Sequence, residues 1–440
     1  MYNFKNTPFF IIFFLLLTVG QFVLSQENVF VSKNEVLAKA LKNNASIKIS
    51  DYEIAIARGD YSQTKAFFLP NISVSHTAIT TNNPLMTFGS KLNQEILTTA
   101  DFNPDLLNNP SQIQDYITKV EINQPIINVD GIYQRRAASA KLMATKLQSG
   151  RTKDYVALNV EKVYMNLQLA YKAVGVLEKA KETALENKRL ANNSFKQGYL
   201  QKADVLSVDV RVTEVDNQLQ YAKSNILNAS NELSFLMNDD TYNIMKPSDS
   251  LTIITENITI SKLSENRKDI KALQQVTEAH QQKYKADKMG FLPRLNAFGS
   301  YELHDDQIFQ GDANGYLLGA ALSWNVLEGT KRFGKAKKSK AEFEKSKSQY
   351  QEYVAKSHVD LKKAHRMYQD AKNKLALTTL ALEHSKESLR IRSNRFKQGL
   401  ERTTDLLMTE TQYVQKQLEY YTAVFQHNYA LAYIKFLTNG

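Results

Sequence analysis

The chain has 440 residues, of which 43% are hydrophobic and 23% are charged, so a wholly disordered protein is excluded. It contains no cysteine, which excludes disulfide bonds, thiolate metal sites and cysteine nucleophiles. Its 16 Gly and 8 Pro amount to roughly half the average usage of about 12%, and this scarcity favours few, long elements. The formal charge of +11 suits either nucleic acid or a surface near anionic lipid.

The first residues predict export from the cytoplasm. Lys5 precedes an apolar run over residues 9–24, and Ser25 follows it as a small residue. This is the pattern of a signal peptide over residues 1–25. The run is shorter than the about 20 apolar residues of a membrane anchor, although a retained anchor stays open as the alternative. An exported chain does not meet chromosomal DNA, so we expect no nucleic-acid partner.

Two long stretches predict helices. Between Gly334 and Gly399 there is neither Gly nor Pro, and one helix over this stretch would be about 96 Å long at about 1.5 Å per residue. A heptad of large and small residues runs through it, which predicts helices coiled along a neighbour. The large positions are Val354, Leu361, Tyr368, Leu375, Leu382, Leu389 and Phe396, and the small ones are Ser357, Ala364, Ala371, Thr378 and Ser385.

The chain contains an internal duplication. Residues 191–238 align with residues 392–439 at a constant offset of 201, with 12 identities. A period of this size indicates a duplicated half rather than a short repeat. We therefore expect a first repeat over residues 26–240, a linker over 241–261 and a second repeat over 262–440.

Each repeat predicts a helix, two strands, a long helix, a turn and a helix. In the first repeat the strand pair lies within 71–124, the long helix covers 131–197 and the next helix 203–238. In the second repeat the strand pair lies within 294–325, the long helix covers 330–398 and the next helix 403–438. The first helix of each repeat is expected over Lys33 to Ala66 and Leu263 to Met289. Residues 81–115 are expected to be a long loop between strands that restricts an outer mouth.

The strands have the length and flanks of membrane strands. Each alternates apolar and polar residues over about nine or ten positions, enough to cross a bilayer when tilted. Aromatic residues near the strand ends suit a lipid–water interface: these are Phe67, Phe68, Phe291 and Trp324. Four strands cannot close a barrel, and an open edge is not tolerated in lipid, so closure needs other copies. A soluble hairpin with one buried face remains the alternative.

Several motifs together resemble a known family. Phe-Leu-Pro occurs at 68–70 and 291–293, Gln124-Pro125 precedes Asp130-Gly131, and Asn-Arg-Lys-Asp occupies 266–269. Phe-Lys-Gln-Gly occurs at 195–198 and 396–399, each with an Asp six residues after the Gly. In this order and at these distances, the chain resembles the TolC-like outer-membrane efflux proteins, the outer membrane factors.

The resemblance implies a fold that is mainly α with a small β component. It implies a trimer whose twelve-stranded transmembrane β-barrel, with four strands per chain, continues as a long periplasmic α-helical coiled-coil barrel. The implied function is an outer-membrane channel of a tripartite efflux or type I secretion system, a passive exit duct for small molecules or secreted substrates. The implied partners are a periplasmic adaptor, an inner-membrane pump of RND or ABC type, and outer-membrane lipid.

The resemblance also implies site residues. The turns with Phe195, Gly198, Phe396 and Gly399 correspond to the periplasmic tips that contact the adaptor. Asp204 and Asp405 correspond to acids at the entrance constriction, and the alternative for both is an Asp that stabilises the first turn of its helix. Independently of the resemblance, a Gly permits a tight helix ending.

Enzymatic chemistry has little support in the sequence. Residues 329–335 match most of a phosphate-binding loop, but Ala336 stands where a magnesium-binding Ser or Thr is required. No two of the seven His are spaced by three or four residues, so a metal site is unsupported. We expect no enzyme and no cofactor. A nucleotide-dependent enzyme and a secreted periplasmic coiled-coil scaffold without a barrel stay as alternatives.

Overall fold

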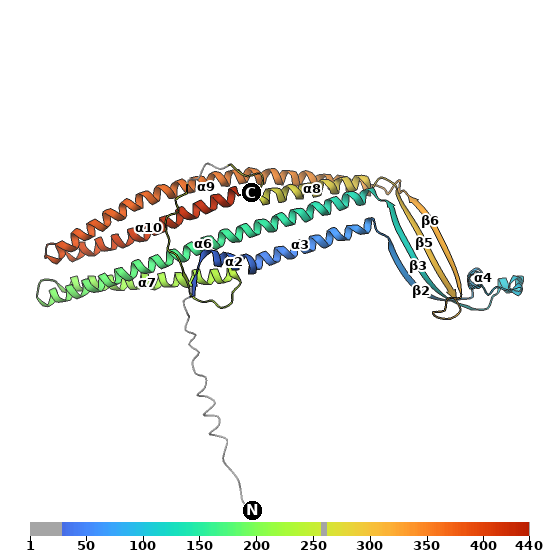
Figure 1. Ribbon diagram of the computed structural model, residues 1–440, viewed down its shortest axis with the longest axis horizontal. Coiled ribbons are helices and arrows are strands. Elements are labelled where there is room, and N and C mark those ends of the chain that lie inside the picture. The colour runs from blue at the N-terminus through green and yellow to red at the C-terminus, as the bar shows by residue number, and fades with distance from the viewer. Residues whose placement is uncertain (1–28, 257–261, 440) are drawn as a thin grey trace, which may run out of the picture. The chain divides into compact units, whose positions relative to one another are not determined.

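The computed structural model describes residues 29–256 and 262–439. The predicted signal peptide over 1–25 and the last residues of the predicted linker lie outside the described residues. The expected fold class, mainly α with a small β component, is confirmed, since long helices and two small sheets make up the described residues (Figure 1). Its residues form two compact units. Of the described residues, the first unit comprises 29–45, 156–256 and 365–433, and the second comprises 46–155, 262–364 and 434–439.

The first unit is a set of helices with a two-stranded ribbon. It contains α2 (Lys33–Asn43), α7 (Lys202–Met237), most of α10 (Thr403–Thr438), and the later parts of α6 (Val129–Lys196) and α9 (Lys331–Lys397). Strand β1 (Val29–Val31) pairs in parallel with β4 (Met245–Pro247), so the predicted linker also contributes a strand. None of the helices within the described ranges is both long and apolar enough to span a membrane.

The small positions of the α9 heptad are buried, as the spacing predicts for a coiled-coil seam. Among the large positions, Leu375 packs with Ala423 and Val424 of α10 and with Leu251. This contact pairs α9 with α10 in the first unit.

The first predicted helix is broken in the structure. Residues Lys33 to Ala66 were expected to form one helix, but α2 ends at Asn43, and α3 (Ala45–Gln63) is followed by the short helix η1 (Thr64–Phe67). Asn44 between them has an extended ψ of 131°, and its side-chain amide donates to the Leu236 carbonyl at 2.8 Å. Asparagine stabilises such breaks because its side chain replaces backbone partners.

The second unit is built around a four-stranded antiparallel sheet. Its strand order is β2 (Asn71–Thr81), β3 (Ile113–Ile127), β5 (Arg294–Asp305) and β6 (Ala313–Ser323). Helices α3, α8 (Lys268–Met289) and the first parts of α6 and α9 belong to the same unit. Helix α8 begins at Lys268 rather than near Leu263, where the sequence predicted its start.

The two faces of the sheet differ in chemistry. The register aligns Val74, Val120, Tyr301 and Tyr316 across all four strands, and this apolar face also carries Ile72, Ile122, Leu318 and Leu322. The opposite, polar face carries Ser73, Ser75, Asp115, Lys119, Glu121, Glu302 and His304. Lys119 and Glu302 form an ion pair at 3.0 Å on the polar face. A two-sided pattern of this kind separates an apolar environment from a wet one.

The segment between β2 and β3 is folded, although the sequence predicted a loop. It contains α4 (Pro84–Asn93), η2 (Thr99–Phe102) and α5 (Pro104–Asn108). Both α-helices begin with an Asn followed by a Pro, a helix-start signal. The Asn83 side chain accepts from the Met86 amide at 3.3 Å, and the Asn103 side chain accepts from the Asp105 amide at 3.0 Å. The helices are too short for their periodicity to be recognised in the sequence.

Candidate functional site

Two equivalent turns end the long helices of the first unit. At the first, the Gly198 amide donates to the Phe195 carbonyl at 3.0 Å and the Tyr199 amide to the Ser194 carbonyl at 2.9 Å. At the second, the Gly399 amide donates to Phe396 at 3.0 Å and the Leu400 amide to Arg395 at 3.0 Å. Gly198 has a φ of +80° and Gly399 a φ of +73°. These are Schellman motifs, in which Gly occupies the left-handed position at the helix end.

The turns expose apolar side chains of the kind that a protein partner covers. Tyr199 and Leu400 are exposed, and the Phe195 ring is half-exposed with the Lys202 ammonium 5.8 Å from its centre. Behind the turns, Ala191, Val208 and Leu407 form a buried cluster that joins α6, α7 and α10. The turns therefore stand on a packed base and present apolar groups to their surroundings.

The two predicted entrance acids have different partners. The Asp204 carboxylate accepts from the Gln201 backbone amide at 3.1 Å and so caps the start of α7. The Asp405 carboxylate lies 4.0 Å from the Arg392 guanidinium, which is itself paired with Glu401 at 2.7 Å. Of these two contacts, the one that Asp405 makes is the longer and therefore the weaker.

The four predicted interface aromatics lie at junctions between helices and the sheet in the second unit. Phe67 and Phe68 contact each other edge to face, with ring centres 6.5 Å apart. The Trp324 indole donates to the Phe291 carbonyl at 3.0 Å, and the Phe291 ring also packs against Phe333. The four residues therefore form two contacting pairs, Phe67 with Phe68 and Phe291 with Trp324.

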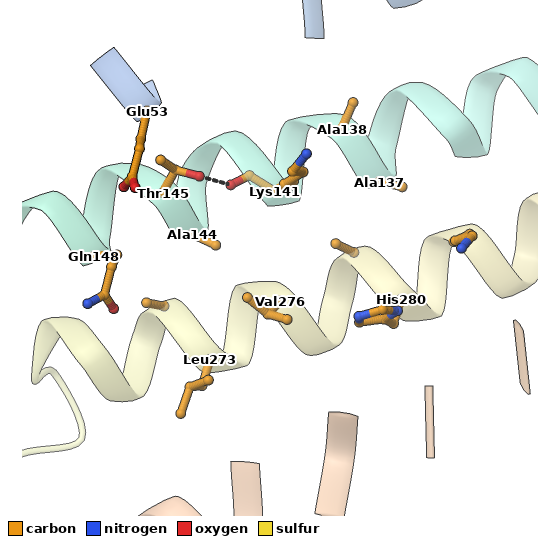
Figure 2. Close-up of a pocket in the computed structure, with 13 residues that line it drawn as sticks. Glu53, Ala137, Ala138, Lys141, Ala144, Thr145, Gln148, Leu273, Val276 and His280 are labelled. Carbon is orange, nitrogen blue, oxygen red and sulfur yellow. Dashed lines mark hydrogen bonds between the residues drawn. The ribbon is translucent and has the colours of Figure 1, made fainter. Parts of the chain in front are cut away.

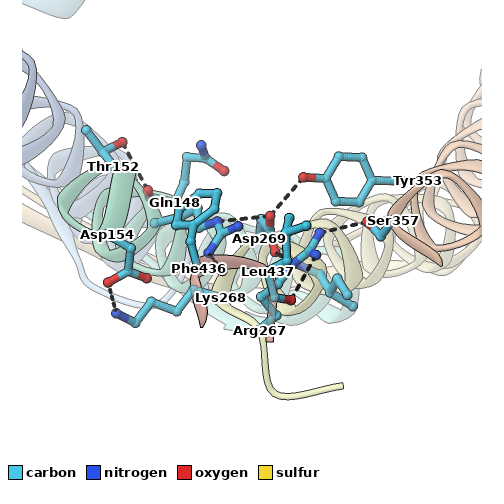
Figure 3. Close-up of polar contacts among 12 residues, drawn as sticks. Gln148, Thr152, Asp154, Arg267, Lys268, Asp269, Tyr353, Ser357, Phe436 and Leu437 are labelled. Carbon is cyan, nitrogen blue, oxygen red and sulfur yellow. Dashed lines mark hydrogen bonds and ion pairs between the residues drawn. The ribbon is translucent and has the colours of Figure 1, made fainter. Parts of the chain in front are cut away.

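A buried polar cluster that the sequence did not predict as a site joins four helices of the second unit (Figure 3). The Asp269 carboxylate of α8 accepts from Arg267 at 2.7 Å and from the Tyr353 hydroxyl of α9 at 2.8 Å, and it pairs with Arg151 of α6 at 3.1 Å. Arg151 donates to the Phe436 carbonyl at 3.0 Å. Arg267 donates to Ser357 at 2.7 Å and to the Leu437 carbonyl at 3.4 Å.

This cluster anchors the end of α10. The last carbonyls of a helix lack intrahelical partners and carry the negative end of the helix dipole, and here two guanidinium groups bind them. The Arg151 guanidinium also lies 3.6 Å from the centre of the Phe436 ring. Burial raises the pKa of the Asp269 carboxyl, but the Arg267 hydrogen bond and the Arg151 charge outweigh it, and the pKa lies below its usual value. Asp269 is therefore held as the anion that balances two buried cations.

An apolar groove lies between α6 and α8 in the second unit (Figure 2). Its volume is about 580 Å³, and Figure 2 shows Ala137 and Ala144 of α6 directed towards α8. Lys141 and Lys283 lie among the lining residues, and each pairs with an acid on a further helix, Asp60 and Glu342 respectively. None of the predicted site residues lines this groove.

A buried acid lies between α6, α7 and α10 in the first unit. The Glu410 side chain is 1% exposed, and one of its oxygens accepts from Asn187 at 2.8 Å, while the other has no hydrogen-bond partner among the described residues. Burial raises the pKa of Glu410, and the nearby Arg211 charge and the Asn187 hydrogen bond only partly oppose this shift. The fold therefore favours the protonated acid more than the unfolded chain does.

The free-energy cost of ionising the buried Glu410 predicts that Glu410→Gln is more thermostable than the unchanged protein at a pH above the ordinary carboxyl pKa. Because the pKa of Glu410 is higher in the folded state than in the unfolded state, the folded protein loses stability as the pH rises above the ordinary carboxyl pKa and the buried acid ionises. Glutamine stays neutral and avoids the loss. Thermal unfolding followed by circular dichroism should show a gain of a few degrees at pH 7.5 that shrinks as the pH is lowered towards 4.5. The exposed Glu178→Gln is the control, and equal melting in both variants at pH 7.5 would contradict the prediction.

Comparison with known proteins gives one family and a consistent fold. Residues 36–239 and 259–440 match the family described as outer membrane efflux protein. A membrane protein from Pseudomonas aeruginosa has a similar structure, with a TM-score of 0.82, 15% identity, and coverage of 92% of this chain and 93% of that one. The Campylobacter jejuni CmeC outer membrane channel is similar with a TM-score of 0.79 and 16% identity, over 92% of this chain and 85% of that one. The Vibrio cholerae outer membrane protein VceC is similar with a TM-score of 0.79 and 16% identity, over 93% of this chain and 96% of that one. No curated protein sequence matches significantly.

Proposed function

The chain belongs to the outer membrane efflux protein family, and from this premise we propose that three copies assemble into one exit duct across the outer membrane. Each copy contributes its four strands to a twelve-stranded barrel and its helices to a periplasmic tunnel. As an efflux channel, the duct is passive, and an inner-membrane pump drives its cargo. A secreted coiled-coil scaffold without a barrel is not favoured by the family match.

The sheet is the observation that carries this proposal. Within the described residues β2 pairs only with β3, and β6 pairs only with β5, so each outer strand has one free edge. The apolar face is exposed at Val74, Tyr316 and Leu318. In lipid an apolar face is favourable, but free backbone groups are not. Pairing β2 of one copy with β6 of the next satisfies both edges at once.

An apolar stripe on α3 supports contact between copies along the tunnel. Ile49, Tyr52 and Ile56 are exposed, and their spacing of three and four places them on one side of the helix. The buried side of α3 carries Ile47 and Ala57. A second apolar side in a water-exposed helix predicts a further helix against it.

The replacement Ile56→Glu should therefore break the assembly. Burying an unpaired charge at an interface costs several kcal/mol per ion, and the trimer repeats this cost at three contacts. Light scattering of the protein in detergent should show trimers for the unchanged chain and mostly monomers for the variant. Arg58→Glu, an exposed position on a different side of α3, should leave the trimer intact. Intact trimers of Ile56→Glu would contradict the arrangement.

The other site residues take roles in the same duct. We propose that a periplasmic adaptor covers the turns with Phe195, Gly198, Phe396 and Gly399, and that it connects the duct to a pump of RND or ABC type. Asp204 and Asp405 lie six residues after these glycines and line the entrance. The aromatic pairs of Phe67, Phe68, Phe291 and Trp324 lie at the boundary between outer-membrane lipid and periplasm.

A further inference from the structure

Residues 82–112, here the mouth segment, connect β2 to β3 and contain α4, η2 and α5. We propose that this segment is a lid: three copies meet on the axis of the barrel and close its outer mouth. The inference rests on the trimeric duct proposed above. It assigns to each copy a surface that is complete only when the other two copies cover it.

The mouth segment is a folded body rather than a slack loop. The Lys91 ammonium pairs with the Asp101 carboxylate at 2.6 Å, and the rings of Phe88 and Phe102 pack edge to face at 5.7 Å. The Asp101 carboxylate also accepts from the Thr98 amide at 2.8 Å. These bonds tie α4 to η2 through both polar and aromatic contacts. A body of this kind keeps one shape at the mouth.

The mouth segment lies over the polar face of the sheet. Asp115, His304 and Ala313 belong to that face by register, and they are only 3%, 7% and 1% exposed. Their neighbours on the apolar face at the same end, Gln114 and Asn314, are exposed. On the apolar face at this end Asp305 is also buried, at 4%, and the Phe309 ring of the second loop lies against His76. Because three residues of the polar face are buried there and α4 adjoins β3 and β6, we assign α4 to the polar face.

A small polar side of α4 holds it there. Thr87, Ser90 and Gln94 are buried, and their spacing of three and four puts them on one side of the helix. The Gln94 amide donates to the carbonyl of Gln114 at 2.8 Å and to that of Asp305 at 3.3 Å. One side chain thereby contacts both β3 and β5 and holds α4 at the end of the sheet, where Figure 1 shows it.

The opposite side of α4 is apolar and uncovered in one copy. Leu85 and Leu92 are 82% and 56% exposed, and they lie on the side of the helix away from Thr87 and Gln94. Other exposed apolar residues extend this surface: Met86, Ile96, Phe102 and Leu106. The apolar face of the sheet is the one that lipid covers, so the polar face lines the pore. An apolar surface above that face points to the pore axis, where the other two copies present the same surface.

The size of the barrel agrees with closure by three copies. Twelve strands spaced about 4.8 Å apart and tilted by about 40° enclose a circle about 24 Å across. A helix with its side chains is about 10–12 Å wide, so three helices packed around an axis span about 22–26 Å. Three mouth segments therefore fill the opening, whereas one would leave most of it free.

Conductance of the purified trimer in planar bilayers tests the lid. In the double variant Leu85→Asp/Leu92→Asp, charges repel across the axis, and conductance should rise several-fold over the unchanged protein. Replacing residues 84–110 by a short Gly-Ser linker should raise it at least as much. Ile308→Asp, an exposed apolar residue of the second strand–strand loop at the same end, is the matched control and should change little. Unchanged conductance in both mouth-segment variants would overturn the lid.

Cross-linking tests the contact itself and separates the lid from the duct. Because the chain has no cysteine, Leu85→Cys introduces a single thiol per copy, and mild oxidation should give disulfide-linked dimers within the trimer. A thiol that stays unlinked and is shielded from a water-soluble maleimide in the membrane would overturn the lid in favour of lipid contact. If light scattering shows no trimer in the unchanged protein, the duct fails. A trimer without cross-links refutes only the lid.

Discussion

The variant Asp269→Ala will lose about 3–5 kcal/mol of stability, the usual result of breaking a buried ion pair on one side. Among the described residues, Asp269 is the one acid whose carboxylate contacts both Arg151 and Arg267 in the buried cluster of the second unit. Without it, two buried cations remain with only hydroxyl, carbonyl and ring partners. The loss also frees the end of α10, because both arginines bind its last carbonyls.

Thermal unfolding followed by circular dichroism measures this effect, and the cluster supplies its own control. Asp154 pairs with Lys268 at 2.7 Å beside the cluster, but both side chains are about a third exposed, so Asp154→Ala should cost at most about 1 kcal/mol. Because the pKa of Asp269 is lowered, its contribution is present at neutral pH and fades as pH falls below the ordinary value of 3.8. Equal destabilisation by the two alanine variants would refute the anchoring role.

The double variant Gly198→Val/Gly399→Val will abolish export while trimers stay in the membrane. A left-handed backbone costs an L-residue about 1–2 kcal/mol, and a β-branched residue adapts to it worst. No atom lies within 4 Å of a Cβ added at either position, so the strain comes from the backbone conformation and not from packing. The helices must end differently at both turns, and the surface offered to the adaptor changes.

Asparagine provides the matched control for these turns. It tolerates the left-handed conformation, so Gly198→Asn/Gly399→Asn should retain export although it adds side chains of similar size. Complementation of a strain that lacks the chain, scored by susceptibility to dyes, detergents and antibiotics, reports export. Trimer abundance in membranes reports assembly. Full export by the valine variant, or equal loss in both variants, would count against the turns as adaptor contacts.

Sequence reasoning worked best where one pattern repeats over many residues. The heptad of α9 predicted a buried seam because small residues recur every seven positions, and the structure buries Ala364 and Ala371. The two glycine turns were recognised because duplication shows the same four residues twice. The strands could be predicted from alternating residues because one face of the sheet is apolar and the other is polar. In each case a local rule and the global fold favour the same residues.

The polar clusters were missed because they depend on contacts between distant parts of the chain. Arg151 occupies a heptad position between Ala144 and Leu158, all three of them buried, and Glu410 lies between the buried Leu407 and Val414 at spacings of three and four. A charge in an apolar seam was a usable signal that something must neutralise it. Nothing in either local sequence names the partner, since Asp269 follows Arg151 by more than a hundred residues.

The parallel pairing of β1 with β4 has a consequence for how the chain acquires its structure. Val29 aligns with Met245, so the hydrogen bonds between β1 and β4 can form only when more than two hundred residues after β1 are present. Contacts that close such large loops arise late and slow folding. In a chain truncated before Met245, the ribbon of β1 and β4 cannot form. The Val31 carbonyl, which accepts from the Tyr164 hydroxyl at 3.1 Å, would then belong to a strand that has no partner. Folding of the first residues would then be completed only after the middle of the chain has been synthesised.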